Sequence, residues 1–390
     1  MKAAVVILCI LNSLAGNLAM AQPYYPESDD EVIETLPPRG KSWFEIKLLR
    51  IKVKSSPAAL QPVLDLASRY IELGRAESDP RYFGYAEAVL APWLKSGQVH
   101  PEVLTLRATL HQNRHEFTSA LAYLDKALAL QPRLGQAWLT RALILEVQGN
   151  YAAALKSCLP LLKLASALVS QVCIASTQSL TGQIDSAYQQ LMLALPAAQS
   201  EPLQNRQWAM VALAEIAERK GDSKAAEQHY RQALKLDRNG YLLAAYADFL
   251  LDRARYREVT ELLRNETRAD TLLLRLTLAE QALQLPTAQA HIVALAARFA
   301  ASRMRGDTVH QGDEARFLLH LAHAPEQALK LAQANWGIQR EPRDARIILE
   351  AADALDCPEQ IQPTLNFLAQ AKLQDVRLQP LVDRLSRSSS

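Results

Sequence analysis

A short pattern of glycine and alanine recurs along this chain and limits the folds it can adopt. Segments 149–154, 182–187 and 221–226 each begin with glycine and reach an alanine five residues later. Segment 115–120 repeats the pattern with a histidine in place of the glycine. Successive glycines lie 33 and 39 residues apart, a spacing typical of arrays of stacked helix pairs. Such arrays usually present a surface to another protein rather than a catalytic centre.

Each position in the pattern has a physical role in a helix pair. A glycine after the first helix, here called helix A, can adopt the left-handed conformation that ends a helix at little steric cost. An alanine in the first turn of the second helix, helix B, lets the two helices approach closely. The pattern therefore predicts helix A, a tight turn and helix B in each repeat.

The start of the chain reads as an export signal. Lys2 precedes an apolar run over 3–11, and Ala19-Met20-Ala21 supplies the small residues of a cleavage site. We expect residues 1–21 to be a signal peptide cleaved after Ala21, with an uncleaved anchor as the alternative. The predicted location is therefore the bacterial periplasm or the exterior of the cell.

Composition and periodicity favour an all-α fold. Apolar residues make up 49% of the chain and aromatic residues 6%, and there are 13 glycines, which disfavours all-β folds and glycine-rich nucleotide loops. A helical period of 3.6 residues runs through the predicted repeat domain, 57–385. The repeats are clearest over 101–240 and degenerate over 241–371, and 376–385 reads as a capping segment. Residues 22–56 read as an N-terminal extension that is partly disordered, because much of it combines prolines with an acidic cluster. The expected helix pairs cover 58–94, 101–134, 135–167, 168–200, 207–240, 241–267, 268–304, 308–338 and 343–371.

Three cysteines remain after the predicted cleavage: Cys158, Cys173 and Cys357. Cys158 and Cys173 fall on consecutive predicted helices, and a disulfide between them is possible in an oxidising compartment. Two buried free thiols are the favoured interpretation, because cysteine is often a small core residue.

Several residues place the repeats in a known family. Residues of the unit at 207–240 resemble the tetratricopeptide repeat, and matching residues recur in the two units that span 101–167. In the order of the chain they are Leu104, Ala108, Phe117, Ala120, Ala127, Pro132, Trp138, Ala142, Leu145, Gly149, Tyr151, Ala154, Met210, Leu213, Ala214, Gly221, Ala226, Tyr230 and Ala233. The chain thus resembles an exported bacterial tetratricopeptide repeat protein. The resemblance implies a right-handed superhelical solenoid of antiparallel helix pairs, whose A helices line a concave groove.

The matching groove positions mix apolar and charged side chains, which suits a docked peptide or helix. Trp208 and Phe249 are the candidate anchors, although both could instead pack against neighbouring helices. The candidate groove residues are Leu139, Glu146, Trp208, Val211, Glu215, Arg219, Phe249 and Arg253.

No catalytic signature or cofactor-binding motif is present, so we expect a non-catalytic scaffold or adaptor without a cofactor. Its predicted partners are other proteins, with self-association possible and no stable membrane insertion after cleavage. A formal net charge of +2 gives no electrostatic footprint for nucleic acid. The alternative function is metal or small-ligand handling by a C-terminal histidine cluster of His310, His320 and His323.

Overall fold

The computed structural model describes residues 26, 28, 30–32, 41–77, 79–95 and 99–388. The predicted signal peptide lies outside these residues, as does most of the extension up to residue 40. Every regular element in the described ranges is a helix. None of those helices is long and apolar enough to cross a membrane.

The chain divides into two compact units, residues 1–47 and 48–390. Helix α2 (Lys41–Ser55) begins in the first unit, where the Trp43 and Phe44 rings meet edge to face at 5.0 Å between centroids. The part of the predicted extension over 41–55 is therefore helical. In the second unit, Arg50 Nε donates a hydrogen bond to the Tyr70 hydroxyl at 2.6 Å, which ties the end of α2 to the first helix pair.

The second unit contains nine successive helix pairs within its described residues, close to the segments expected from the sequence. The first five are α3 (Leu60–Ala76) with α4 (Arg81–Lys95), α5 (Pro101–Asn113) with α6 (Phe117–Leu130), α7 (Gly135–Val147) with α8 (Tyr151–Cys158), α10 (Ala167–Gln178) with α11 (Ile184–Ala194), and α12 (Leu203–Lys220) with α13 (Ser223–Leu236). Short helices α9 (Leu161–Leu164) and η1 (Pro196–Ser200) follow α8 and α11.

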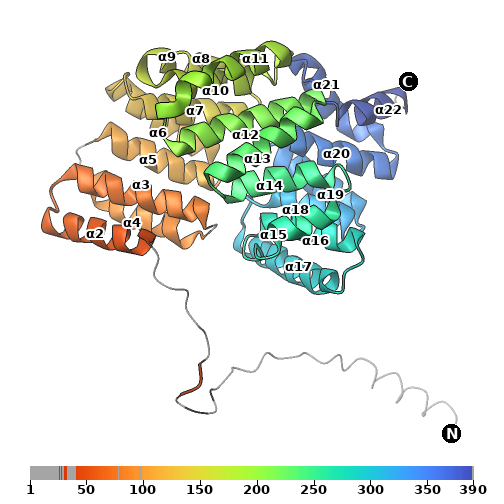
Figure 1. The fold of residues 1–390 in the computed structure, drawn as a ribbon, viewed down its shortest axis with the longest axis horizontal. Helices are drawn as coiled ribbons and strands as arrows, with labels where there is room; N and C mark the ends of the chain where they lie inside the picture. The colour runs from red at the N-terminus through yellow and green to blue at the C-terminus, as the bar shows by residue number, and fades with distance from the viewer. Residues whose placement is uncertain are drawn as a thin grey trace, which may run out of the picture. The chain divides into compact units, whose positions relative to one another are not determined.

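The degenerate half of the sequence continues the same architecture. Its pairs are α14 (Gly240–Leu251) with α15 (Tyr256–Leu263), α16 (Asp270–Ala282) with α17 (Thr287–Arg305), α18 (Gln311–His320) with α19 (Pro325–Trp336), and α20 (Pro342–Leu355) with α21 (Gln362–Ala371). The short helix η2 (Pro358–Ile361) precedes α21, and α22 (Gln379–Ser388) contains the predicted capping segment. The fold is thus an all-α helical repeat solenoid (Figure 1).

The turns explain why the later repeats are hard to see in the sequence. Gly149, Gly182 and Gly221 have φ angles of 76°, 78° and 86°, as expected for a left-handed residue that ends helix A. In other pairs the left-handed residue is not glycine. His115, Ala254, Gln284, His323 and Asp356 hold φ between 51° and 57°. The turn geometry is therefore retained where its glycine signal is lost.

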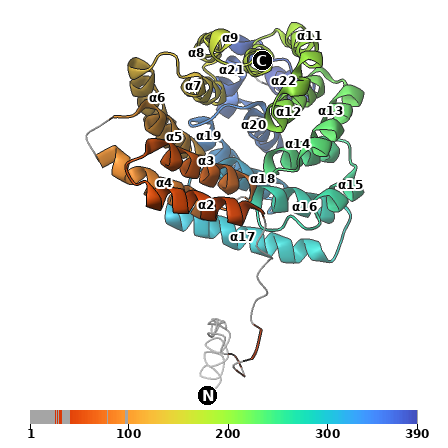
Figure 2. The same cartoon turned by 60° about the vertical axis from the view of Figure 1, so that its left-hand side comes forward.

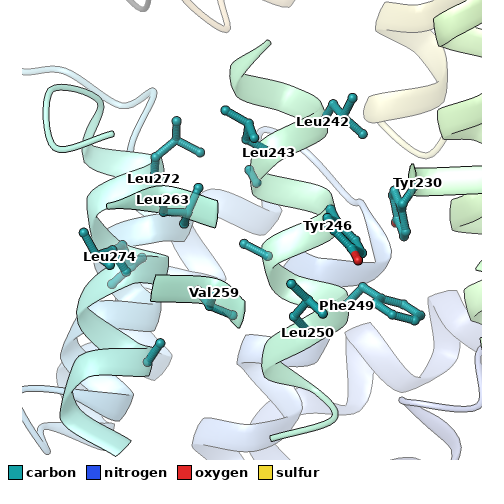
Figure 3. Close-up of a cluster of buried hydrophobic side chains, with 14 of the residues drawn as sticks. Tyr230, Leu242, Leu243, Tyr246, Phe249, Leu250, Val259, Leu263, Leu272 and Leu274 are labelled. Carbon is teal, nitrogen blue, oxygen red and sulfur yellow. The ribbon is translucent and has the colours of Figure 1, made fainter. Parts of the chain in front are cut away.

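The small residues of helix B are at the centre of the packing. Ala120, Ala154, Ala187, Ala226 and Ala328 are all fully buried, consistent with close approach of the two helices in each pair. A large cluster of buried side chains extends from α12 to α18 and includes leucines of α14 and α16 (Figure 3).

A disulfide joins the third and fourth pairs, so the favoured interpretation of two free thiols was wrong. Cys158 at the end of α8 bonds to Cys173 of α10, with their Cα atoms 5.7 Å apart. Helix B ends at Cys158, Pro160 follows two residues later, and the chain reaches α10 through the short helix α9. Cys357 is free and buried.

Within the second unit, the solenoid curves so that repeats far apart in the sequence meet. Figure 2 shows α19 and α20 inside a ring of helices that includes α5, α7, α12, α14 and α16. Arg268, between α15 and α16, lies 3.6 Å from Asp79, between α3 and α4. The inner face of the ring is therefore lined by A helices and partly filled by the C-terminal repeats.

Candidate functional site

The predicted groove residues come from three A helices on the inner face of the solenoid. Leu139 and Glu146 lie on α7, and Trp208, Val211, Glu215 and Arg219 lie on α12. Phe249 lies on α14, and Arg253 follows that helix. Helix α10 packs against both α7 and α12, and α12 packs against α14. The structure therefore brings the three helices into one continuous wall.

Phe249 is a core residue and not an exposed anchor. Its side chain is 0% exposed, with its ring 5.6 Å from the Tyr230 ring and 5.9 Å from the Tyr246 ring (Figure 3). The guanidinium of Arg253 covers the Phe249 ring at 3.7 Å. Val211, at 5% exposed, belongs to the same buried cluster. The alternative in which Phe249 packs against neighbouring helices is thus the one the structure shows.

Trp208 and Leu139 remain half-buried. Both pack against the cluster formed by Ala142, Leu161 and the disulfide cysteines. Tyr241, in the first turn of α14, is 54% exposed and donates a hydrogen bond from its hydroxyl to Glu215 Oε1 at 2.6 Å. Two aromatic side chains, Trp208 of α12 and Tyr241 of α14, therefore keep exposed surface.

Two glutamates of the inner face are held in a poorly solvated environment. The Thr177 hydroxyl donates to Glu146 Oε2 at 2.5 Å, yet burial raises the pKa of Glu146 to about 7. Burial also raises the pKa of Glu215. Arg219 opposes both shifts, and its Nη2 donates to Ser179 Oγ at 2.6 Å. Arg219 is 8% exposed, so its side chain joins α12 to the turn after α10 instead of facing a partner.

The chain's own C-terminal half covers the ends of the A helices. The Arg340 backbone N–H donates to the Val147 carbonyl at 2.7 Å, and the Val376 N–H donates to the Arg219 carbonyl at 3.0 Å. Each accepting carbonyl lies two residues before a left-handed glycine, Gly149 or Gly221. Carbonyls in the last turn of a helix have no partner within that helix, which makes them available acceptors.

The turn glycines themselves are in contact with C-terminal side chains. A Cβ atom added to Gly149 would lie 2.6 Å from Phe367 Cζ, and one added to Gly182 would lie 3.1 Å from Lys372 Cβ. A Cβ atom added to Gly221 would lie 3.4 Å from Val376 Cγ1. These three glycines are thus constrained both by their backbone conformation and by the segment that covers them.

Ion pairs made by Arg377 and Arg346 also join the C-terminal half of the chain to the ends of α12 and α14. Glu218 lies 3.3 Å from Arg377 and 3.7 Å from Arg253, and its pKa is nevertheless raised to about 7 by burial. Asp252 accepts hydrogen bonds from Arg346 at 2.7 Å and 2.8 Å. Arg253, predicted as a partner contact, is therefore engaged within the molecule.

A second charged cluster joins α14 to α16 and α18. Asp248 pairs with Arg275 at 2.8 Å and with Arg316 at 2.6 Å. Burial opposes ionisation of Asp248, but the two guanidinium groups outweigh it and lower the carboxyl pKa. Arg316 and Asp248 lie 68 residues apart in the sequence, so no local pattern pairs them.

Comparison with known proteins identifies the repeat. The family model for the tetratricopeptide repeat matches residues 209–239, which cover most of α12 and α13. The chain therefore contains a tetratricopeptide repeat formed by α12 and α13. This repeat is the unit of a protein–protein interaction scaffold.

Solved structures with a similar arrangement share little sequence with this chain. The APC/C hetero-tetramer Cut9–Hcn1 aligns at 11% identity and a TM-score of 0.43 over 88% of this chain. This chain spans 52% of that chain, about half its length. The human IFIT1 dimer with m7Gppp-AAAA aligns at 13% identity and a TM-score of 0.40, over 89% of this chain and 86% of that one. A comparison with curated proteins found no significant match.

His310, His320 and His323 do not gather into a metal site within the part of the chain that the structure describes. His320 Nε2 lies 3.0 Å from Glu350 Oε2, His310 precedes α18, and His323 occupies the left-handed turn position before α19. Among the described residues, no group of three or more His, Cys, Asp or Glu side chains could hold a metal ion. The alternative function based on this cluster has no support in the structure.

A cavity of about 600 Å³ lies between α21 and α22. Its lining includes Leu365, Leu368 and Val382 together with polar residues such as Lys372 and Asp375. The sequence offered no sign of this cavity, because it depends on how the last two helices cross.

Proposed function

We propose that this protein is a non-catalytic scaffold of the bacterial cell envelope that binds a peptide or helix of a partner protein on the inner face of its solenoid. The observation that carries the proposal is the strip of half-buried and exposed side chains on α7, α12 and α14. This strip, here called the open strip, consists of Leu139, Trp208, Glu215 and Tyr241. Two aromatic side chains beside a carboxylate suit anchoring of an apolar or aromatic segment that carries a polar group.

The open strip keeps solvent-accessible surface, which supports its role in binding a partner segment. Phe249, Val211 and Arg219 are committed to the core, so they support the wall and do not contact a partner. Trp208 and Tyr241 retain exposed surface on adjacent A helices, and the Tyr241–Glu215 hydrogen bond holds two of the strip residues together. A partner segment would gain most of its binding free energy by covering the two rings.

Affinity capture with crosslinking and mass spectrometry tests the partner proposal. The full exported chain would be compared with a Trp208→Ala/Tyr241→Ala variant and with a Lys224→Ala control on the exposed start of α13. We expect one discrete partner that is captured by wild type and by the control and is lost from the double variant. Capture of the same partner by a folded double variant would place the binding surface elsewhere. Absence of any partner above background would contradict the scaffold proposal.

Export can be tested separately. Amino-terminal sequencing of the protein recovered from its native cell envelope should read Gln22 first if cleavage follows Ala21. A mature chain that still begins at Met1 would support the anchored alternative. Recovery only from the cytoplasm would contradict the envelope location.

A further inference from the structure

Helix α2 presents an apolar stripe to solvent. Phe44, Leu48 and Ile51 recur at positions i, i+4 and i+7 of this one continuous helix, which places them on one face. These residues are 56%, 60% and 54% exposed. We infer that this face, here called the outer face of α2, binds the surface of a bilayer that contains anionic phospholipids. The inference concerns a different surface from the open strip and does not rest on the proposed function.

The opposite side of α2 is apolar as well. Ile46, Leu49 and Val53 recur at positions i, i+3 and i+7 on that side. Ile46 is 7% exposed, and Leu49 and Val53 are half-buried. A helix that buries one apolar side in a protein usually carries polar residues on the other. Folding of the chain therefore leaves a second apolar face of α2 uncovered.

Basic side chains border the outer face. With about 100° of rotation per residue, Lys47 and Lys54 fall on one side of the apolar stripe and Lys52 falls on the other. All three lysines are exposed. Helix α2 contains five basic residues and one acidic residue, whereas the whole chain has a formal net charge of only +2. Positive charge is therefore concentrated where the apolar stripe meets solvent.

This combination matches the layers of a bilayer surface. The apolar stripe would lie among the first acyl carbons, while the long lysine side chains extend to the phosphates. Each lysine close to an anionic leaflet strengthens the attraction about fivefold. Flexible ammonium groups suit mobile lipid phosphates, whereas fixed carboxylates of a folded partner favour the rigid fork of arginine.

An aromatic ring lies at the border of the outer face. Trp43 is 37% exposed, and Lys47 Nζ lies 5.3 Å from the centre of its ring. Tryptophan is enriched at the level of the lipid headgroups, where an amphipathic ring meets both layers. Helix α2 has 15 residues, fewer than the roughly 20 that span a bilayer, so it would lie in the plane of the surface.

Co-sedimentation of the mature chain with lipid vesicles tests the inference. The mature chain is used because the predicted signal peptide would bind lipid by itself. The vesicles consist of phosphatidylcholine alone or with about 30% of the anionic phosphatidylglycerol. We expect binding to the anionic vesicles to be at least about tenfold tighter, and to be lost in about 1 M salt, where the screening length is about 3 Å. Equal binding to both vesicles, or binding to neither, would overturn the inference.

Two variants separate the apolar contribution from the charged one. The substitutions are Phe44→Ser, Leu48→Ser and Ile51→Ser in the first variant, and Lys47→Gln, Lys52→Gln and Lys54→Gln in the second. Each variant should bind anionic vesicles at least about tenfold more weakly at an unchanged melting temperature, because all six residues are exposed. A control variant, Leu162→Ser/Leu193→Ser, changes two exposed leucines of α9 and α11 and should bind like wild type. Wild-type affinity in both α2 variants would contradict the inference.

Fluorescence quenching provides a second test that leaves the stripe and its lysines unchanged. Brominated phospholipids in the anionic vesicles should quench the fluorescence of Trp43, and a Trp43→Phe variant should lose that quenching. Quenching that is the same in the two proteins would show that α2 does not meet the lipid.

The acidic segment that precedes α2 is the competing occupant of the outer face. Residues 27–34 contain five carboxylates, which could pair with the bordering lysines. Vesicle binding that appears only after these carboxylates are replaced by amides would assign the outer face to this segment and overturn the inference. Capture of an acidic protein that requires the three lysines, without any vesicle binding, would overturn it as well.

Discussion

At the residue scale, the turn glycines combine two constraints that are usually separate. Gly149, Gly182 and Gly221 need a left-handed backbone, and each also lies against a side chain from the C-terminal half. Gly306 has a similar φ of 73° with nothing within 4 Å of an added Cβ atom. Comparing alanine substitutions at Gly149 and Gly306 therefore separates the free-energy cost of the left-handed backbone from that of a steric clash with Phe367.

We predict that Gly149→Ala destabilises the protein more than Gly306→Ala. Left-handed backbone costs an L-residue about 1–2 kcal/mol, which applies to both variants. The added methyl at 149 also displaces Phe367, and overpacking adds about 1–3 kcal/mol. Denaturant unfolding followed by circular dichroism measures both. Equal losses in the two variants would mean that Phe367 does not press on the turn in solution.

The small residue of helix B allows a second prediction. Ala226 is fully buried in the cluster that contains Ala214 and Ala217 of α12. Ala226→Trp should force α12 and α13 apart and lower the melting temperature, with a loss of at least about 1–3 kcal/mol. Lys224→Trp, at an exposed position of the same helix, serves as the control. A melting curve unchanged by Ala226→Trp would show that the register assigned to this repeat is wrong.

At the element scale, the disulfide compensates for an interrupted helix B. Helix α8 is eight residues long and is followed by Pro160, so it has a short face to pack against α7 and α10. The bond from Cys158 to Cys173 fixes the end of α8 on α10 across a separation of 15 residues. Leu139 and Trp208 pack against the buried cluster that contains the two disulfide cysteines.

We predict that reduction of this disulfide destabilises the solenoid by about 3 kcal/mol, the loop-closure value for a loop of this size. The measurement is the melting temperature with and without dithiothreitol. A Cys158→Ala/Cys173→Ala variant should melt lower and should be insensitive to the reductant. Thiol titration of the unfolded, oxidised mature chain should find one thiol, that of Cys357; three thiols would contradict the bond.

At the scale of the whole molecule, buried carboxyls make stability depend on pH. Burial raises the pKa of Glu146, Glu218 and Asp344 to about 7. A folded-state pKa above the unfolded value contributes stability that is present in acid and is lost as pH rises through the folded value. Salt bridges and hydrogen bonds outweigh burial at Glu350 and lower its pKa to about 2, while hydrogen bonds from Arg255 lower the pKa of Glu227 to about 2. These two groups contribute stability that is lost as pH falls toward 2.

The two sets of carboxyls together predict greatest stability near about pH 5, with a loss between about pH 5 and 7. The free energy of unfolding in denaturant, measured across that range, checks this expectation. A Glu146→Gln/Glu218→Gln variant should flatten the slope, because its side chains no longer titrate. Wild-type stability that rises steadily from pH 5 to 7 would contradict the assigned burial of these groups.

The sequence by itself determined the helix pairs, because each depends on local chemistry. The spacing of Gly149, Gly182 and Gly221 and the alanine five residues after each gave the repeat and its turns. The pairs of the degenerate half also followed from helical periodicity, although Ala254 and Gln284 replaced the expected glycine. A left-handed turn tolerates these residues at a modest cost, so the fold persists where the motif does not.

Only the tertiary structure decided which inner-face residues are available. Phe249 was a candidate anchor from its repeat position, but the packing of α14 against α13 buries it beside Tyr230 and Tyr246. The contact of Arg340 with Val147 joins residues almost two hundred positions apart. Such a contact depends on small rotations summed over many repeats, and no local pattern records that sum. The Cys158–Cys173 bond likewise required a Cα separation of 5.7 Å, which follows from the packing of α8 on α10 and not from the spacing of the cysteines.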